Sequence, residues 1–256
     1  MTKFLTLVVS VILIIFSFCQ ADAKSTNLHI DPQVALGAYK GLVEDHLAGV
    51  LRTVSVIAQT SEARSAKWET VKPLLDRLSK DLPTGPTVWF ALPDGSYYSV
   101  ESGGLTEQSL MGRPYFSRLL AGQDVLGDLV ISRSTNQRFV VVASPVIENG
   151  KVVAVIGVSV KVHLLAALIE SKMMLPEKAY FYALDTDTKI VLHRYLERVF
   201  KMVENVGDEK LAESFKASMK QDEGIFNYSL HGKKMSSIFQ KSKTLGWYFF
   251  IAQERK

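Results

Sequence analysis

The stretch GRPYFSRLLAGQDVLGDLVISRSTNQRFVVVASPVIENGKVVAVIGVSV, residues 112–160, decides both the fold and the kind of function. Arg113 and two aromatic residues begin a short predicted helix over 114–120, and strands are predicted at 129–132, 138–144 and 151–160. The stretch contains no cysteine, no histidine and no paired carboxylates. Because nucleophilic and metal chemistry need such groups, this composition favours ligand binding over catalysis.

Two helices and a hairpin are predicted before this stretch. Asp31-Pro32 is a typical helix start, with a side-chain acceptor at the N-cap and proline at the first helical position. The helix that follows carries an apolar stripe at steps of three and four, formed by Val43, Leu47, Val50, Val54 and Ile57. A second helix is predicted at 68–82, and the change to alternation at 88–92 and 96–100 predicts a β-hairpin.

A second group of elements follows a predicted helix at 162–172. Strands are predicted at 180–184, 190–193, 225–230, 234–239 and 247–252, with a helix at 208–220. The elements repeat the architecture of the first group at smaller size, without a residue-by-residue repeat. The fold class predicted is therefore α+β, with a long N-terminal helix packed on two tandem units whose sheets are antiparallel.

The amino terminus predicts export. Lys3 precedes an apolar run over residues 4–18, and Ala21-Asp22-Ala23 has the small-x-small pattern of a signal peptidase site. The run is shorter than the ~20 residues that a membrane-spanning helix needs. We therefore expect a signal peptide cleaved after Ala23 and a periplasmic protein, with an uncleaved membrane anchor as the alternative. Cleavage would remove Cys19, the one cysteine, so redox chemistry is not expected.

Composition and histidine placement limit the partners. The net charge is +4, but the basic residues are scattered, so nucleic acid is not an expected partner. The histidines lack a second ligand at metal spacing, and Asp185, Asp187 and His193 are interpreted as a strand turn instead of a metal site. No metal or cofactor is expected. The histidines are His29, His46, His163, His193 and His231.

Three segments resemble the double Cache family, the extracellular sensor modules of bacterial chemoreceptors, histidine kinases and cyclic-nucleotide signalling proteins. They are RPYF with the AGQDVLGD that follows it, SRSTNQRFVVVASPV and NGKVVAVIGVSV. The resemblance implies a long helix and two stacked PAS-like units, with a small metabolite bound in the unit farther from the membrane. On that plan residues 1–23 are the signal peptide, 24–83 the two helices, 84–172 the ligand-binding unit and 173–256 a second, smaller Cache-like unit.

Arg113 is the candidate ligand contact that both the residues and the resemblance favour, because a guanidinium suits a carboxylate. The other candidate ligand-binding residues are Tyr115, Phe116, Trp89, Tyr98, Ile131, Arg133 and Ser159. Adjacent helical residues point about 100° apart, so one of the two helical rings is expected at the cavity, and Tyr115 is preferred for its hydroxyl. Two alternatives stay open: Arg113 could pair with Asp124 or Asp128, and Arg133 could be solvated.

Two departures from the family's amino-acid sensors favour a different ligand. Those sensors have Trp-Tyr one residue after the arginine, where this chain has Tyr115-Phe116. They also have an aspartate that receives the ligand's ammonium, where this chain has Ser159. An ammonium would be poorly compensated in such a desolvated site. An organic acid, held by Arg113 and Arg133, is therefore expected in preference to an amino acid.

The resulting expectation is a sensor domain without enzymatic activity. Because the chain ends three residues after Gln253 with no output domain, we expect an accessory to a membrane receptor, histidine kinase or transporter in chemotaxis-like sensing. A structural module with a vestigial pocket is one alternative. A periplasmic hydrolase is another, although no serine has a histidine partner that the sequence can assign.

Overall fold

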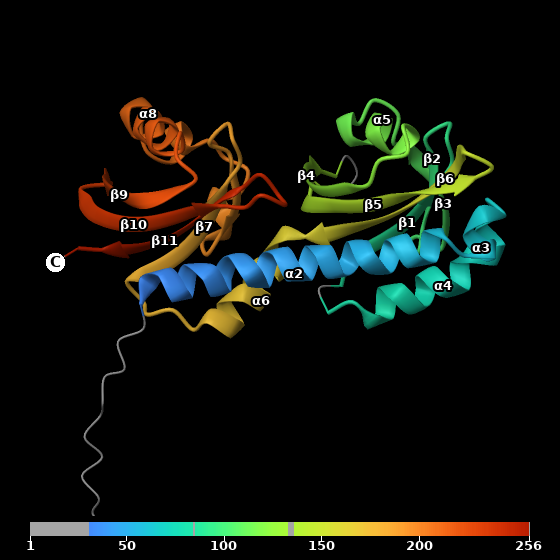
Figure 1. Ribbon diagram of the computed structural model, residues 1–256, viewed down its shortest axis with the longest axis horizontal. Coiled ribbons are helices and arrows are strands. Elements are labelled where there is room, and N and C mark those ends of the chain that lie inside the picture. The colour runs from blue at the N-terminus through green and yellow to red at the C-terminus, as the bar shows by residue number, and fades with distance from the viewer. Residues whose placement is uncertain (1–30, 84, 133–135, 256) are drawn as a thin grey trace, which may run out of the picture. The chain divides into compact units, whose positions relative to one another are not determined.

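The computed structural model describes residues 31–83, 85–132 and 136–255. The predicted signal peptide and its cleavage site lie outside these residues. The predicted fold class is confirmed: one long helix and two antiparallel sheets, each with shorter helices (Figure 1). No helix in the described ranges is long and apolar enough to cross a membrane.

The long helix α2 (Pro32–Ala58) buries one stripe of side chains against both sheets. The stripe consists of Leu36, Tyr39, Val43, Leu47, Val50, Val54 and Ala58. These residues recur at steps of three and four, so they lie on one face of a helix with 3.6 residues per turn. The helix contacts strands of both sheets, and its buried stripe belongs to the largest hydrophobic core of the protein.

The first sheet has six strands in the order β3-β2-β1-β6-β5-β4. The strands are β1 (Thr87–Ala91), β2 (Ser96–Ser99), β3 (Gly104–Ser109), β4 (Val125–Ile131), β5 (Arg138–Glu148) and β6 (Lys151–Lys161). The accompanying helices are α3 (Ser61–Arg64), α4 (Trp68–Asp81), α5 (Pro114–Leu120) and α6 (Val162–Met173). Strand β3 was not among the strands predicted, because this edge strand is almost entirely polar and lacks apolar alternation.

Alternation along the central strands gives the first sheet two different faces. Val88, Phe90 and Ile156 point toward the core that includes α2 and α4. Trp89, Ala91 and Val155 point to the opposite face, where they pack with Tyr115, Phe116 and Leu119 of α5. The face that carries α5 is the one that holds the cavity described below.

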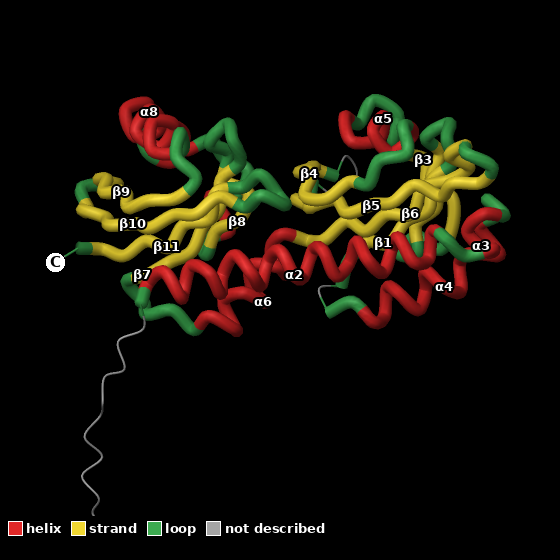
Figure 2. The backbone as a smooth tube through the Cα atoms, in the orientation of Figure 1, coloured by secondary structure: helices red, strands yellow, loops and turns green. Residues whose placement is uncertain are grey.

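The second sheet has five strands in the order β8-β7-β11-β10-β9. They are β7 (Ala179–Leu184), β8 (Ile190–His193), β9 (Glu223–Leu230), β10 (Lys233–Lys241) and β11 (Tyr248–Glu254), with the helices η1 (Leu196–Arg198), α7 (Val203–Val206) and α8 (Glu209–Ser218). Asp208 caps α8 through the amide of Leu211. Helix α8 lies over one face of this sheet, as Figure 2 shows, and forms a separate aromatic core with it.

Strand β4 contacts the loop before β11 at a β-bulge. The register of β4 shifts between Leu126 and Asp128, and Gly127 between them has a φ of +93°. A side chain at Gly127 would face Leu245 and Trp247, which fill the space above it. Glycine therefore permits both the backbone conformation and the close approach of the two segments.

Candidate functional site

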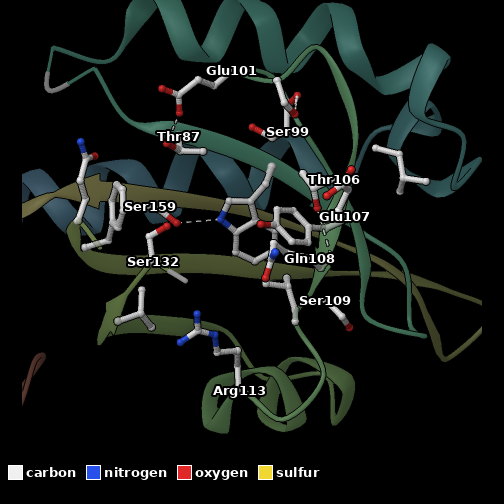
Figure 3. A pocket seen from close by; sticks show the side chains of 18 of the residues that line it. Thr87, Ser99, Glu101, Thr106, Glu107, Gln108, Ser109, Arg113, Ser132 and Ser159 are labelled. Carbon is white, nitrogen blue, oxygen red and sulfur yellow. Dashed lines mark hydrogen bonds between the residues drawn. The ribbon is translucent and has the colours of Figure 1, made fainter. Parts of the chain in front are cut away.

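A cavity of about 540 Å³ lies on the α5 face of the first sheet. Thr87 and Trp89 of β1 line it, together with their cross-strand partners Ser159 of β6 and Ser99 of β2. Side chains of paired strands point to the same face, so residues from three strands meet at one surface. The central strands form the floor, and β3 and the segment before α5 form walls (Figure 3).

The floor of the cavity is organised by Trp89. The indole Nε1–H donates a hydrogen bond of 3.1 Å to the hydroxyl oxygen of Ser159. The ring lies directly over Gly157, where an added Cβ would overlap the indole carbons. Trp89 is 3% exposed, so its ring orientation is fixed by the missing side chain at Gly157 and by the bond to Ser159.

Arg113 lies at the N-cap of α5 and reaches the cavity from the side opposite Thr87 and Glu101 (Figure 3). Its guanidinium Nη2 donates to the carbonyl oxygen of Ile131 at 3.2 Å. The residue is half-buried, and no ion pair involving it occurs among the described residues. The guanidinium therefore keeps further donors that can face a ligand.

The two aspartates considered as partners of Arg113 are used elsewhere. Asp128 pairs with Arg118 of α5, and Asp124 accepts a hydrogen bond of 2.7 Å from the hydroxyl of Ser144. Neither aspartate is paired with Arg113 in the part of the chain that is described.

The two helical rings have different environments, as expected for neighbours on a helix. Tyr115 lines the cavity and is 4% exposed. Phe116 points into the core beneath α5, where it packs with Leu119 and Val125. Phe116 thus supports the cavity wall instead of lining it.

Two other candidates are placed away from the cavity by the alternation of the strands. Tyr98 stacks on Trp68 on the opposite face of the sheet, with ring centroids 5.1 Å apart. Its neighbour Tyr97 lines the cavity instead and meets Trp89 edge-on. Ile131 is 45% exposed and contributes its carbonyl group to Arg113. Neither Tyr98 nor Ile131 is among the residues that line the cavity.

Arg133 lies outside the described residues. Of the expected pair of cations, the structure therefore describes Arg113. Among the neighbours of Arg133 that are described, Ser132 lines the cavity. The role of Arg133 as a second cation stays a prediction.

Two carboxylates at the cavity were not identified from the sequence. Glu101 and Glu107 both line it, and both are exposed. The Thr87 hydroxyl donates to Glu101 Oε2 at 2.8 Å, which fixes this carboxylate at the rim. The sequence signal is weak because both glutamates lie in or beside the polar edge strand β3, which has the composition of a loop.

The chemistry available at the cavity is that of binding. The described residues of its lining are hydroxyl, amide, aromatic and apolar side chains together with Arg113, Glu101 and Glu107, and no histidine or cysteine is among them. In the part of the chain that the structure describes, no three His, Cys, Asp or Glu side chains are grouped to hold a metal ion. In the second unit, Asp185 accepts from the amides of Asp187 and Lys189, which is the turn expected for this segment.

The sequence and the fold are both similar to known sensor modules. The sequence profile of the Cache domain matches residues 33–256. The chain belongs to the Cache domain family. The resemblance seen in three short segments is thus confirmed over nearly the whole described chain. A comparison with curated proteins found no match.

Solved Cache-type sensor domains share the fold. The ligand-binding domain of the Pseudomonas aeruginosa PAO1 amino acid chemoreceptor PctB, in complex with L-Arg, is similar with a TM-score of 0.68 and 20% identity, covering 87% of this chain and 93% of that chain. The sensory domain of the Campylobacter jejuni chemoreceptor Tlp3, with isoleucine bound, gives 0.63 and 14%, covering 86% and 89%. The sensor domain of the V. cholerae histidine kinase DctB gives 0.64 and 14%, covering 88% and 96%.

Proposed function

We propose that this Cache domain is an extracytoplasmic sensor that binds a small organic acid through Arg113. The observation that carries the proposal is the geometry of the cavity: a guanidinium with no acidic partner among the residues described faces a space of about 540 Å³ with an aromatic floor. A charge-assisted bond between guanidinium and carboxylate is strong where neighbouring rings exclude water. Trp89, Tyr97 and Tyr115 are the rings that would do so here.

The hydrogen bonding of the Ser159 hydroxyl supports an organic acid as the ligand in preference to an amino acid. An indole N–H is only a donor, so the oxygen of Ser159 accepts from Trp89 and its hydrogen is left to donate into the cavity. This hydroxyl can donate to a carboxylate or hydroxyl oxygen, but it is uncharged and cannot compensate the charge of an ammonium group in a desolvated site. The ligand end near Ser159 is therefore better matched by an uncharged polar group or a carboxylate than by an ammonium group.

The glutamates at the rim favour one carboxylate in the ligand over two. A second carboxylate directed toward Glu101 would meet a like charge. An ammonium group could approach Glu101, but the carboxylate is exposed, and a pair formed in water contributes at most about 1 kcal/mol. We therefore favour a monocarboxylic acid with an uncharged polar group.

The role proposed for the domain is supported by the proteins that share its fold. PctB and Tlp3 are chemoreceptors whose domains were solved with amino acids bound, and DctB is a histidine kinase. We infer that this domain likewise reports the presence of a small ligand to a membrane receptor, histidine kinase or transporter. A pull-down from membranes, with and without ligand, should recover such a partner, and recovery of none would contradict this part of the proposal.

Matched pairs of compounds test the ligand class. Lactate and alanine, or 2-hydroxyisovalerate and valine, differ only in the group beside the carboxylate. The hydroxy acids should raise the melting temperature and the amino acids should not, because a ligand stabilises the state that binds it. Equal or larger shifts with the amino acids would refute the preference for organic acids. No shift with any member of the panel would favour a structural module with a vestigial pocket.

Variants of two arginines on the same helix test the contact. Arg113→Gln should weaken binding of the best acid by at least about tenfold, the loss expected for a charge-assisted contact. Arg118→Gln is the matched control, since Arg118 pairs with Asp128 and does not line the cavity. Unchanged binding in Arg113→Gln would exclude the role given to this residue.

A further inference from the structure

A second, smaller cavity lies between the second sheet and α8, and a buried imidazole at its lining has a donor for which the described residues supply no acceptor. It has a volume of about 30 Å³ and is lined by apolar side chains of β7, β8, α7, α8 and β9. The polar residues at its lining are Tyr180, Tyr182, His193, Arg198 and Tyr228. None of them belongs to the site on the first sheet.

The hydrogen bond that His193 accepts determines where its proton lies. The backbone N–H of Tyr195 donates to His193 Nδ1 at 2.8 Å, so Nδ1 carries a lone pair and no hydrogen. An imidazole that is unprotonated at Nδ1 must carry its hydrogen on Nε2. His193 is 3% exposed, so this Nε2–H is a buried donor.

The polar group recorded beside that donor is another donor. Arg198 Nη1 lies 3.5 Å from His193 Nε2, and a guanidinium has no acceptor atom. The two groups therefore cannot bond to each other, and the structure gives Nε2 no other partner. A buried donor without an acceptor is rare in native proteins and indicates a missing acceptor nearby.

Arg198 also lacks a carboxylate partner in the described part of the chain. The guanidinium lies over the ring of Tyr195, 5.1 Å from its centroid, and no ion pair of Arg198 occurs among the described residues. The phenols next to it supply no negative charge, because burial raises the pKa of Tyr180 and of Tyr182 above the ordinary value. Their hydroxyls bond mainly to Tyr228 and Ser237.

We propose that this cavity is a second ligand site, which binds a short aliphatic monocarboxylate of the size of acetate. The carboxylate accepts hydrogen bonds from His193 Nε2–H and from the Arg198 guanidinium. It also supplies the negative charge that pairs with this guanidinium. The apolar end of the ligand enters the space lined by residues such as Leu184, Val203 and Leu211. A space of about 30 Å³ holds only one or two groups of the size of a water molecule, so it has room for a methyl group and excludes a long chain.

Nuclear magnetic resonance of the isotope-labelled protein tests the site directly. Titration with sodium acetate should produce saturable shifts of the His193 Nε2–H and the Tyr195 amide, and hexanoate should not. Sodium chloride at equal ionic strength should leave both signals in place. The absence of a saturable acetate shift, or an equal shift with chloride, would overturn the proposal.

Variants separate this site from the one on the first sheet. Arg198→Gln should weaken acetate binding by at least about tenfold, because the half-buried side chain keeps its polar character and loses the charge. Arg113→Gln should leave the acetate shifts of His193 unchanged, since Arg113 lines the other cavity. Acetate-induced shifts of His193 that survive Arg198→Gln, or that are lost in Arg113→Gln, would refute a second site at this place.

Discussion

The indole of Trp89 lies on the backbone of Gly157, its cross-strand partner, with no room for a side chain between them. The ring occupies the space where a Cβ at residue 157 would project. The position of the main aromatic surface of the cavity thus depends on an absent side chain one strand away. A glycine in the middle of a buried strand, which lowers strand stability by itself, has a packing reason here.

Gly157→Ala should move Trp89 and damage the cavity. The new methyl group overlaps the indole, so either the ring leaves its position or the strands separate, at a cost of about 1–3 kcal/mol in the free energy of unfolding. Binding of the ligand should weaken in parallel, because the floor is displaced. Urea unfolding and tryptophan fluorescence measure the two effects.

Gly104→Ala is the matched control for this substitution. Gly104 also lies in a strand of the first sheet, and a Cβ there has no atom within 4 Å. Alanine at 104 should therefore be neutral or slightly stabilising. If Gly157→Ala behaves as Gly104→Ala does, the close packing of Trp89 on residue 157 is not important for the site.

The residues of the site show what a sequence can and cannot predict. Arg113 and Ser159 lie in segments with strong signals, a proline-started helix and a long apolar strand, and both reach the cavity. Tyr97 and Tyr98 differ by one position, and alternation gives them opposite faces without saying which face holds the cavity. That choice depends on packing partners distant in sequence, such as Trp68 beneath Tyr98.

The acidic rim could not be predicted for a different reason. Glu101 and Glu107 reach the cavity because a polar segment pairs with β2 as an edge strand. The pairing uses backbone groups, so the side chains of this strand carry little sign of it.

The second cavity was also missed, because His193 was considered only as a metal ligand. The hydrogen bond from the Tyr195 amide shows that the imidazole hydrogen lies on Nε2, and the sequence alone does not reveal that bond.

The hydrogen bond between Trp89 and Ser159 should contribute about 1 kcal/mol to stability. Ser159→Ala leaves the buried indole N–H without a partner, which costs about 1–3 kcal/mol. Trp89→Phe removes the donor, so a second change at Ser159 should then cost little. A double-mutant cycle by urea unfolding measures the difference, and additive losses would show that the two side chains are not coupled.

Stability should fall in mild acid because His193 resists protonation. Burial, with a smaller effect of the Arg198 charge, lowers the pKa of His193 from 6.5 to about 3. Below pH 6.5 the unfolded chain therefore binds a proton that the folded protein does not, and the free energy of unfolding decreases by about 1.4 kcal/mol for each pH unit toward the folded pKa. Burial also lowers the pKa of His46, which adds a loss of the same sign.

Comparison with His193→Gln isolates this contribution. Glutamine keeps an acceptor for the Tyr195 amide and a donor on the same side chain but does not titrate. The variant should lose stability less steeply than the unsubstituted protein between pH 6.5 and about 5, a window above the titration of ordinary carboxylates. His163→Gln, a change at an exposed histidine, is the control. Urea unfolding in buffers free of carboxylates provides the measurement, since acetate itself is the proposed ligand. Parallel pH profiles for the unsubstituted protein and His193→Gln would show that His193 is protonated as easily in the folded state as in the unfolded chain.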